Sequence, residues 1–260
     1  MKYGIFLLLF SVSWIMSAQS EFTLEKIGES RFESDQLVKI DNFGTFFYVK
    51  GQEFIKSSQG KEINFSNIQL GDITAADAFN PLKVNLFYEA FNTAIILDNR
   101  LAEIAIINFN EKSPFRLCTL VSAGYDNTIW IYNQNTQQLE LYDYMADRTR
   151  VNTLPLEGNA LDLSSNFNYS YLLTDQALYT FNYFGNLVAK AANPGFSEIT
   201  ESNGKIIAKQ GNQLQMLNEI NGEFLSLELP ELLIKQFFLT DETLYIYDGE
   251  ILHQFHLKGK

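Results

Sequence analysis

The chain has 260 residues, of which 31 are acidic and 19 are basic, so its formal net charge at pH 7 is −12. A surface with this balance repels phosphate backbones and anionic lipid headgroups, which argues against nucleic-acid binding. Cys118 is the single cysteine, so an intrachain disulfide is excluded and a buried core with hydrogen bonding must stabilise the fold.

The first 18 residues have the pattern of a secretory signal peptide. Lys2 supplies a positive charge, residues 5–16 form an apolar run, and Met16-Ser17-Ala18 offers small residues before a cleavage point. We expect cleavage after Ala18, which leaves residues 19–260 as a single domain. The alternative is an uncleaved membrane anchor, but the run is shorter than the roughly 20 apolar residues that a span needs. Cys118 lies far from the cleavage point, so no lipid anchor is expected at this signal.

After this segment, short apolar runs alternate with turns rich in Asn, Asp and Gly, a pattern typical of β-hairpins. The clearest marker is the second strand of each repeat, predicted at residues 45–49, 84–88, 128–132, 170–173, 205–208 and 243–247. The central residues of these strands are 39, 44, 42, 35 and 38 positions apart, counted at Phe47, Leu86, Trp130, Leu172, Ile207 and Tyr245. A period near 40 with about four strands per repeat is typical of β-propeller blades.

The last repeat supplies strands only at residues 236–239, 243–247 and 251–255, whereas residues 22–27 form a strand without a repeat of its own. Pairing that strand with the last repeat closes the ring and removes two exposed sheet edges. The sequence therefore predicts an all-β, six-bladed propeller of four-stranded antiparallel blades, closed by the N-terminal strand.

One repeat carries a family resemblance. Asp126-Asn127-Thr128-Ile129-Trp130-Ile131-Tyr132 resembles the repeats of bacterial two-component-regulator and NHL-type propellers, in which an Asp or Asn turn opens a strand with Trp or Tyr. Residues 241–247 resemble the same pattern. The resemblance implies the propeller fold and no particular function. The composition, rich in Phe, Tyr, Asn and Lys, and Gln19 after the cleavage point resemble exported proteins of Bacteroidota.

The sequence predicts no catalytic residue and no metal site, and it indicates no cofactor. Residues 122–130 resemble a sialidase Asp box only loosely, and a hairpin with a structural Trp explains them better. There is no Gly-x-Ser-x-Gly elbow. His253 and His256 are three apart on one predicted strand, so we expect opposite faces and a surface or edge position.

Three sets of residues are candidates for binding. Asp77, Asp162 and Glu198 lie on predicted innermost strands and are candidate channel residues, although channel wall or hairpin partners explain them as well. Residues 142–145 and 181–185 are aromatic runs that could stack on a sugar or peptide or pack between blades. Phe109, Phe115 and Arg116 of the longest inter-blade connection are candidate partner contacts, although a plain crossover explains that loop equally well.

Two functions remain open. The first is a non-enzymatic protein-interaction or scaffold module of the bacterial cell envelope, which docks on a protein partner through one rim. The alternative is an enzyme that acts on a glycan or lactone at the central funnel, with calcium as an optional metal. The missing motifs favour the first. The signal predicts an exported protein, periplasmic, outer-membrane-associated or secreted, with no transmembrane segment after cleavage.

Overall fold

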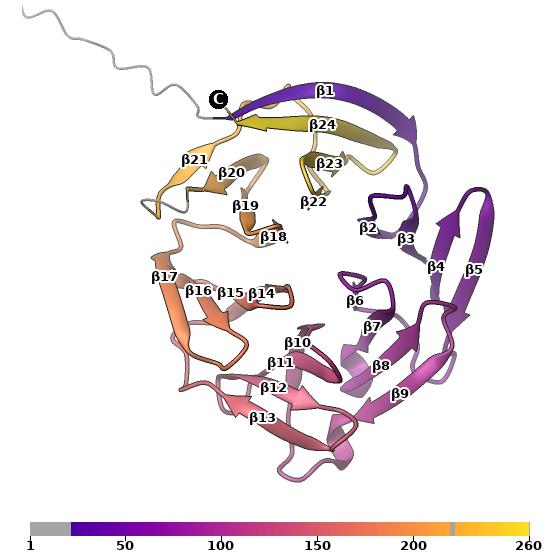
Figure 1. Cartoon of the computed structure of the whole chain (residues 1–260), viewed down its shortest axis with the longest axis vertical. Helices are drawn as coiled ribbons and strands as arrows, with labels where there is room; N and C mark the ends of the chain where they lie inside the picture. The colour runs from indigo at the N-terminus through magenta and orange to yellow at the C-terminus, as the bar shows by residue number, and fades with distance from the viewer. Residues whose placement is uncertain (1–21, 219–221, 260) are drawn as a thin grey trace, which may run out of the picture.

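The regular spacing of the apolar strands places six four-stranded antiparallel sheets around one axis (Figure 1). This computed structural model describes residues 22–218 and 222–259. The predicted signal peptide, residues 1–18, lies outside the described residues. The predicted six-bladed propeller is confirmed. Within the described ranges, no helix is long and apolar enough to cross a bilayer.

In the first five blades, the chain runs from the innermost strand outward. Blade 1 holds β2 (Gln36–Ile40), β3 (Phe46–Lys50), β4 (Glu53–Ser58) and β5 (Lys61–Ser66). Blade 2 holds β6 (Ala75–Asp77), β7 (Lys83–Tyr88), β8 (Thr93–Asp98) and β9 (Glu103–Asn108). Blade 3 holds β10 (Cys118–Ala123), β11 (Thr128–Asn133), β12 (Gln138–Asp143) and β13 (Arg148–Asn152). Blade 4 holds β14 (Ala160–Ser165), β15 (Tyr169–Thr174), β16 (Ala177–Asn182) and β17 (Leu187–Ala192). Blade 5 holds β18 (Glu198–Ser202), β19 (Lys205–Gln210), β20 (Gln213–Leu217) and β21 (Phe224–Ser226).

Blade 6 joins the two ends of the described chain. It consists of β22 (Gln236–Thr240), β23 (Thr243–Tyr247), β24 (Ile251–Gly259) and, outermost, β1 (Phe22–Arg31). β1 and β24 run antiparallel from the Phe22–Gly259 pair to the Arg31–Ile251 pair, with a bulge between Lys26 and Gly28. The predicted closure by the N-terminal strand is therefore confirmed, and the strand continues beyond residue 27.

The position of β24 corrects one expectation. His253 is buried, and its Nε2 lies 3.0 Å from Asp248 Oδ2, whereas His256 is half-buried. The predicted surface or edge position is wrong for His253, because β1 covers β24 and makes it an interior strand.

The core lies between the blades rather than within one central cluster. A separate group of buried apolar side chains fills each of the six junctions between neighbouring blades. Successive residues on a strand point to opposite faces of its sheet. Trp130 accordingly packs against blade 4, and Ile131 beside it packs against blade 2. This explains why the second strands are mostly apolar: both of their faces are buried.

The antiparallel order also sorts the loops into two rims. The turns between the first and second strands of a blade, and those between the third and fourth strands, lie at one end of the propeller, which we call the turn rim. The turns between second and third strands, together with the inter-blade connections, lie at the other end, which we call the crossover rim.

Candidate functional site

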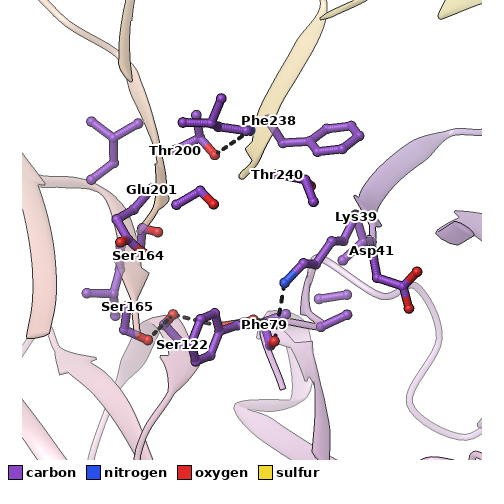
Figure 2. A pocket seen from close by; sticks show the side chains of 18 of the residues that line it. Lys39, Asp41, Phe79, Ser122, Ser164, Ser165, Thr200, Glu201, Phe238 and Thr240 are labelled. Carbon is purple, nitrogen blue, oxygen red and sulfur yellow. Dashed lines mark hydrogen bonds between the residues drawn. The ribbon is translucent and has the colours of Figure 1, made fainter. Parts of the chain in front are cut away.

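A cavity of about 490 Å³ lies on the propeller axis. All six innermost strands line it, and so do the turn-rim residues Phe43 and Asp241. Two further turn-rim residues of the lining, Asp41 and Phe79, are labelled in Figure 2. The cavity therefore reaches the turn rim. Its wall is rich in hydroxyl groups, from Ser122, Ser164, Ser165, Thr200, Ser202 and Thr240.

Asp77, one of the candidate channel residues, stands on this wall and is fully engaged in hydrogen bonds. Its Oδ2 accepts from Ser122 Oγ and from the backbone N–H of Ala123, both at 2.7 Å. Its Oδ1 accepts from the backbone N–H of Phe79 at 2.7 Å. Because Ser122 and Ala123 belong to β10, the carboxylate joins the innermost strands of blades 2 and 3.

Asp162 makes the same kind of connection one junction further on. It also lines the cavity, and its Oδ2 accepts from the backbone N–H of Ile199 in β18 at 2.8 Å. The third candidate, Glu198, is outside the set of lining residues and forms an ion pair with Lys209 at 2.6 Å. The expectation that Glu198 faces the channel is therefore wrong, because its carboxylate turns to the neighbouring strand β19.

Comparable contacts occur at the other junctions, so the innermost strands are linked all around the ring. They are Gln236 Oε1 with Leu37 N (2.8 Å), Thr240 Oγ1 with Ile40 O (2.6 Å), Lys39 Nζ with Phe79 O (3.2 Å), Ser122 Oγ with Ser165 Oγ (2.8 Å) and Thr200 Oγ1 with Leu239 N (3.3 Å). We call these contacts, together with those of Asp77 and Asp162, the inter-blade clasps. A buried polar group without a partner is costly, so each clasp stabilises its junction and fixes the register of neighbouring blades.

The clasp at Asp162 makes stability depend on pH. Burial raises the pKa of this carboxyl to about 6, although the N–H groups of Ile199 and Leu163 oppose the rise. The folded protein then holds this proton more tightly than the unfolded chain does. Asp162 therefore contributes stability below about pH 4, and this contribution is lost as pH rises through about 6.

Asp162→Asn should remove this pH-dependent loss, since Asn carries no charge. Its single Oδ1 can still accept from the N–H of Ile199, whereas the N–H of Leu163 loses its acceptor at every pH. We expect the free energy of unfolding of the variant, relative to the wild type, to rise by about 2 kcal/mol between pH 4.5 and pH 7.5. Urea unfolding at the two pH values measures this. Asp72→Asn, at an exposed turn, is the control and should change stability by less than about 0.5 kcal/mol at either pH. A difference for Asp162→Asn that is equal at both pH values would contradict the assignment.

Lys39 extends into the cavity from β2 (Figure 2). Its Nζ donates to Phe79 O and lies 5.2 Å from the centre of the Phe79 ring. Burial lowers the pKa of this amine, while the negative charges of Asp77 and Asp41 act in the opposite direction. The ammonium group is thus accommodated by an aromatic face, a carbonyl oxygen and the field of nearby carboxylates.

Two further acidic residues line the cavity near the turn rim. Glu201 Oε1 accepts from Asn166 Nδ2 at 2.9 Å and from the N–H of Gly204 at 2.7 Å. Asp241 is exposed and accepts from Asn203 Nδ2 at 2.8 Å. Among the residues that the structure describes, no group of three or more His, Cys, Asp or Glu side chains is arranged to hold a metal ion.

A row of aromatic side chains runs outward from the cavity over the turn rim of blades 2 to 4. Phe79 meets Phe167 at 4.8 Å between ring centres, and Tyr125 meets Tyr183 at 5.5 Å, which in turn meets Phe184 at 4.0 Å. The two groups adjoin within blade 4, where the N–H of Tyr183 donates to Asn168 O. We call these five residues the aromatic band. Phe167 is 50% exposed and Phe184 is 63% exposed, so the band is open to a partner.

The predicted contact loop lies on the other rim and differs from expectation. Phe109 is fully buried against Tyr142, with 5.6 Å between ring centres. Arg116 is buried too, and its Nε donates to Glu140 Oε2 at 2.8 Å. The prediction that these two side chains are exposed contacts is wrong, because they pack this connection onto blade 3. Phe115 is 50% exposed, and its role as a contact remains a prediction.

Comparisons with known proteins agree with the fold. The sequence matches no protein-family model and no curated protein. Among solved structures, a chain of a mitotic checkpoint complex superimposes with a TM-score of 0.64 at 8% identity, covering 98% of both chains. A streptogramin B lyase gives 0.59 at 10% identity, covering 91% of this chain and 98% of the other. BamB from Moraxella catarrhalis gives 0.52 at 13% identity, covering 92% and 99%. The chain is thus a six-bladed β-propeller, and at these identities the likeness concerns the fold alone.

Proposed function

We propose that this chain is a non-enzymatic protein-interaction module of the bacterial cell envelope and that it docks on its partner through the turn rim. The observation that carries the proposal is the aromatic band. Exposed aromatic side chains that gather in one place are typical of interaction sites, since they bury a large area at little cost in conformational entropy.

The band is also held in place before any partner binds. The turn that carries Tyr183 and Phe184 is closed by Asn182 Oδ1, which accepts from the N–H of Phe184 at 3.0 Å and from the N–H of Asn186 at 3.0 Å. Its Gly185 lies so close to Val151 of blade 3 that a Cβ at this position would collide with Val151 Cγ1. A rigid aromatic surface loses little freedom on binding, which favours affinity.

The enzymatic alternative has less support from the cavity. A glycosidase or lactonase site needs carboxylates that are free to meet a substrate or calcium. The Asp77 and Asp162 carboxylates instead accept backbone N–H groups of the next blade, and Glu198 is paired with Lys209. The streptogramin B lyase among the structural neighbours supports the enzymatic alternative only through its similar fold.

The envelope location rests on the signal-peptide pattern of residues 1–18. Two structural neighbours offer analogies at the level of fold. The checkpoint-complex chain is a similar fold within a protein assembly, and BamB is a similar fold from a bacterium. The resemblance to two-component-regulator and NHL-type repeats, and to Bacteroidota proteins, remains part of this proposal.

Truncation of the band should abolish partner capture. We expect Phe167→Ala/Phe184→Ala in the chain from residue 19 to lose at least about tenfold of the partner recovered from envelope extract, because central aromatic contacts contribute about 2 kcal/mol each. The measurement is quantitative mass spectrometry of captured proteins. The melting temperature should change little, since both side chains are at least half exposed.

The matched control is Ile68→Ala/Leu154→Ala, which truncates two apolar side chains on the crossover rim that are each 83% exposed. The partner is defined as a protein that the wild type and this control both retain. If the band variant retains the same protein at the same level, docking through the turn rim is refuted.

A further inference from the structure

The aromatic band and the axial cavity form one continuous surface. Phe79 belongs to both, because it lines the cavity and contacts Phe167 of the band. From Phe79 the band leads outward across blades 3 and 4 to Phe184, while the cavity opens inward beside it. A segment lying along the band would therefore end with one side chain at the mouth of the cavity.

The charged groups that line the cavity are mostly acidic. The cavity is lined by the acidic residues Asp41, Asp77, Asp162, Glu201 and Asp241 and by one basic residue, Lys39. Asp41 and Asp241 lie in the turns of the rim, and Asp241 is exposed. With a formal net charge of −12 for the whole chain, the surroundings reinforce the negative field.

The basic groups beside the band are already engaged. Arg150 lies over the Tyr125 ring and forms an ion pair with Asp143 at 2.6 Å. Lys83 Nζ donates to Asn127 Oδ1 at 2.9 Å. The charge of Arg150 is therefore balanced by Asp143, and both cations lie on the opposite side of Phe79 from the mouth.

Lys39 shows how a cation is held at this site, although burial lowers the pKa of its amine. Its ammonium sits over an aromatic face, donates to a carbonyl oxygen and is surrounded by carboxylates. Aromatic faces and carboxylates together favour a cation over an anion or a neutral group. The volume of about 490 Å³ leaves room beside Lys39 for a further side chain.

We propose that the partner presents an extended basic peptide segment: its apolar side chains lie on the aromatic band, and an Arg or Lys side chain enters the acidic mouth between Asp41 and Asp241. This inference rests on the proposed docking function and specifies the chemistry of the partner. Charge complementarity selects the occupant, because an acidic segment would meet repulsion at the mouth.

The test uses a capped, fluorescently labelled peptide of about six residues that alternates Leu and Arg, with binding measured by fluorescence anisotropy. Asp41→Asn/Asp241→Asn should raise its Kd at least about tenfold and flatten its salt dependence. Asn at position 41 can still accept from the N–H groups of Phe43 and Thr45, so the turn is kept. Asp35→Asn/Asp175→Asn removes the same charge on the crossover rim and should leave Kd within about twofold.

Three outcomes would overturn the inference. They are an equal loss of affinity in both pairs of variants, no binding by the wild type, and equal binding of a peptide with Glu in place of Arg. The capture assay from envelope extract distinguishes a failure of the basic-segment inference from a failure of the proposed docking function. If Phe167→Ala/Phe184→Ala loses the natural partner while Asp41→Asn/Asp241→Asn keeps it, docking stands and the basic segment fails. If the band variant keeps the natural partner, the proposed function itself fails.

Discussion

Deleting residues 22–31 should lower the melting temperature by about 10 to 20 °C and make the protein prone to aggregation. The deletion removes the outer strand of blade 6 and leaves the edge of β24 unpaired. Phe22 and Leu24, which pack on the core between blades 5 and 6, are lost with it. A net loss of about 5 kcal/mol in the free energy of unfolding corresponds to this shift for a domain of this size. Calorimetry and light scattering measure the two effects.

The exposed ion pair between Glu25 and Lys258 provides a control within the same strand. Glu25→Gln removes this pair but keeps the strand, so it should change the melting temperature by less than about 2 °C. A synthetic peptide of residues 22–31 added in trans should restore part of the lost stability. A deletion variant that melts like the intact protein would show that closure by β1 contributes nothing.

Replacing Arg116 with Leu should cost about 3 to 5 kcal/mol, because it leaves the buried Glu140 carboxylate without its cation. Arg116 also donates to Thr149 Oγ1 and to Pro114 O, both at 2.9 Å, so the connection from blade 2 loses its attachment to blade 3. Urea unfolding of the wild type and the variant measures the effect. This result would separate a packing role for Arg116 from the contact role predicted by sequence.

The double variant Arg116→Leu/Glu140→Met removes both charges together. It should recover a large part of the stability lost by Arg116→Leu, since no buried charge is then left unpaired. Recovery should be incomplete, because Asn133 Nδ2 donates to Glu140 Oε1 in the native protein and loses that acceptor. A double variant as unstable as the single one would mean that the ion pair is not the reason for the loss.

The fold was predictable because two physical signals repeat along the chain. Strands buried on both faces are mostly apolar, and the tight turns between them need residues that tolerate unusual backbone angles. Asp126, Asn203 and Asp241 adopt positive φ in the turns before β11, β19 and β23. The closure of the ring could be predicted from the number of strands. The last repeat has three strands, and the extra strand at residues 22–31 completes it as the fourth.

The candidate site was less predictable, because a sequence does not say which partner a polar group meets. Asp77 and Asp162 are recognisable in the sequence as acidic residues on inner strands. Their role as hydrogen-bond acceptors, however, depends on N–H groups that are 46 and 37 positions away in the chain. Arg116 lies in the irregular part of the connection and Phe109 begins a short 3-10 helix (η2, Phe109–Glu111), and both side chains pack on blade 3. One signal for the aromatic band was available. Phe167 stands inside the short turn Asn166-Phe167-Asn168, where backbone geometry has no need of an aromatic ring.

The pairing of β1 with β24 in blade 6 also determines the order in which the chain can fold. Glu25 in β1 forms an ion pair with Lys258 in β24, 233 positions later, so β1 has no partner strand until β24 has been synthesised. Until then the nascent chain holds an open arc with free strand edges at both ends. A ribosome-bound chain therefore cannot close the ring before β24 has been synthesised. That delay suits a protein that must be threaded unfolded through a membrane pore, as the proposed export requires.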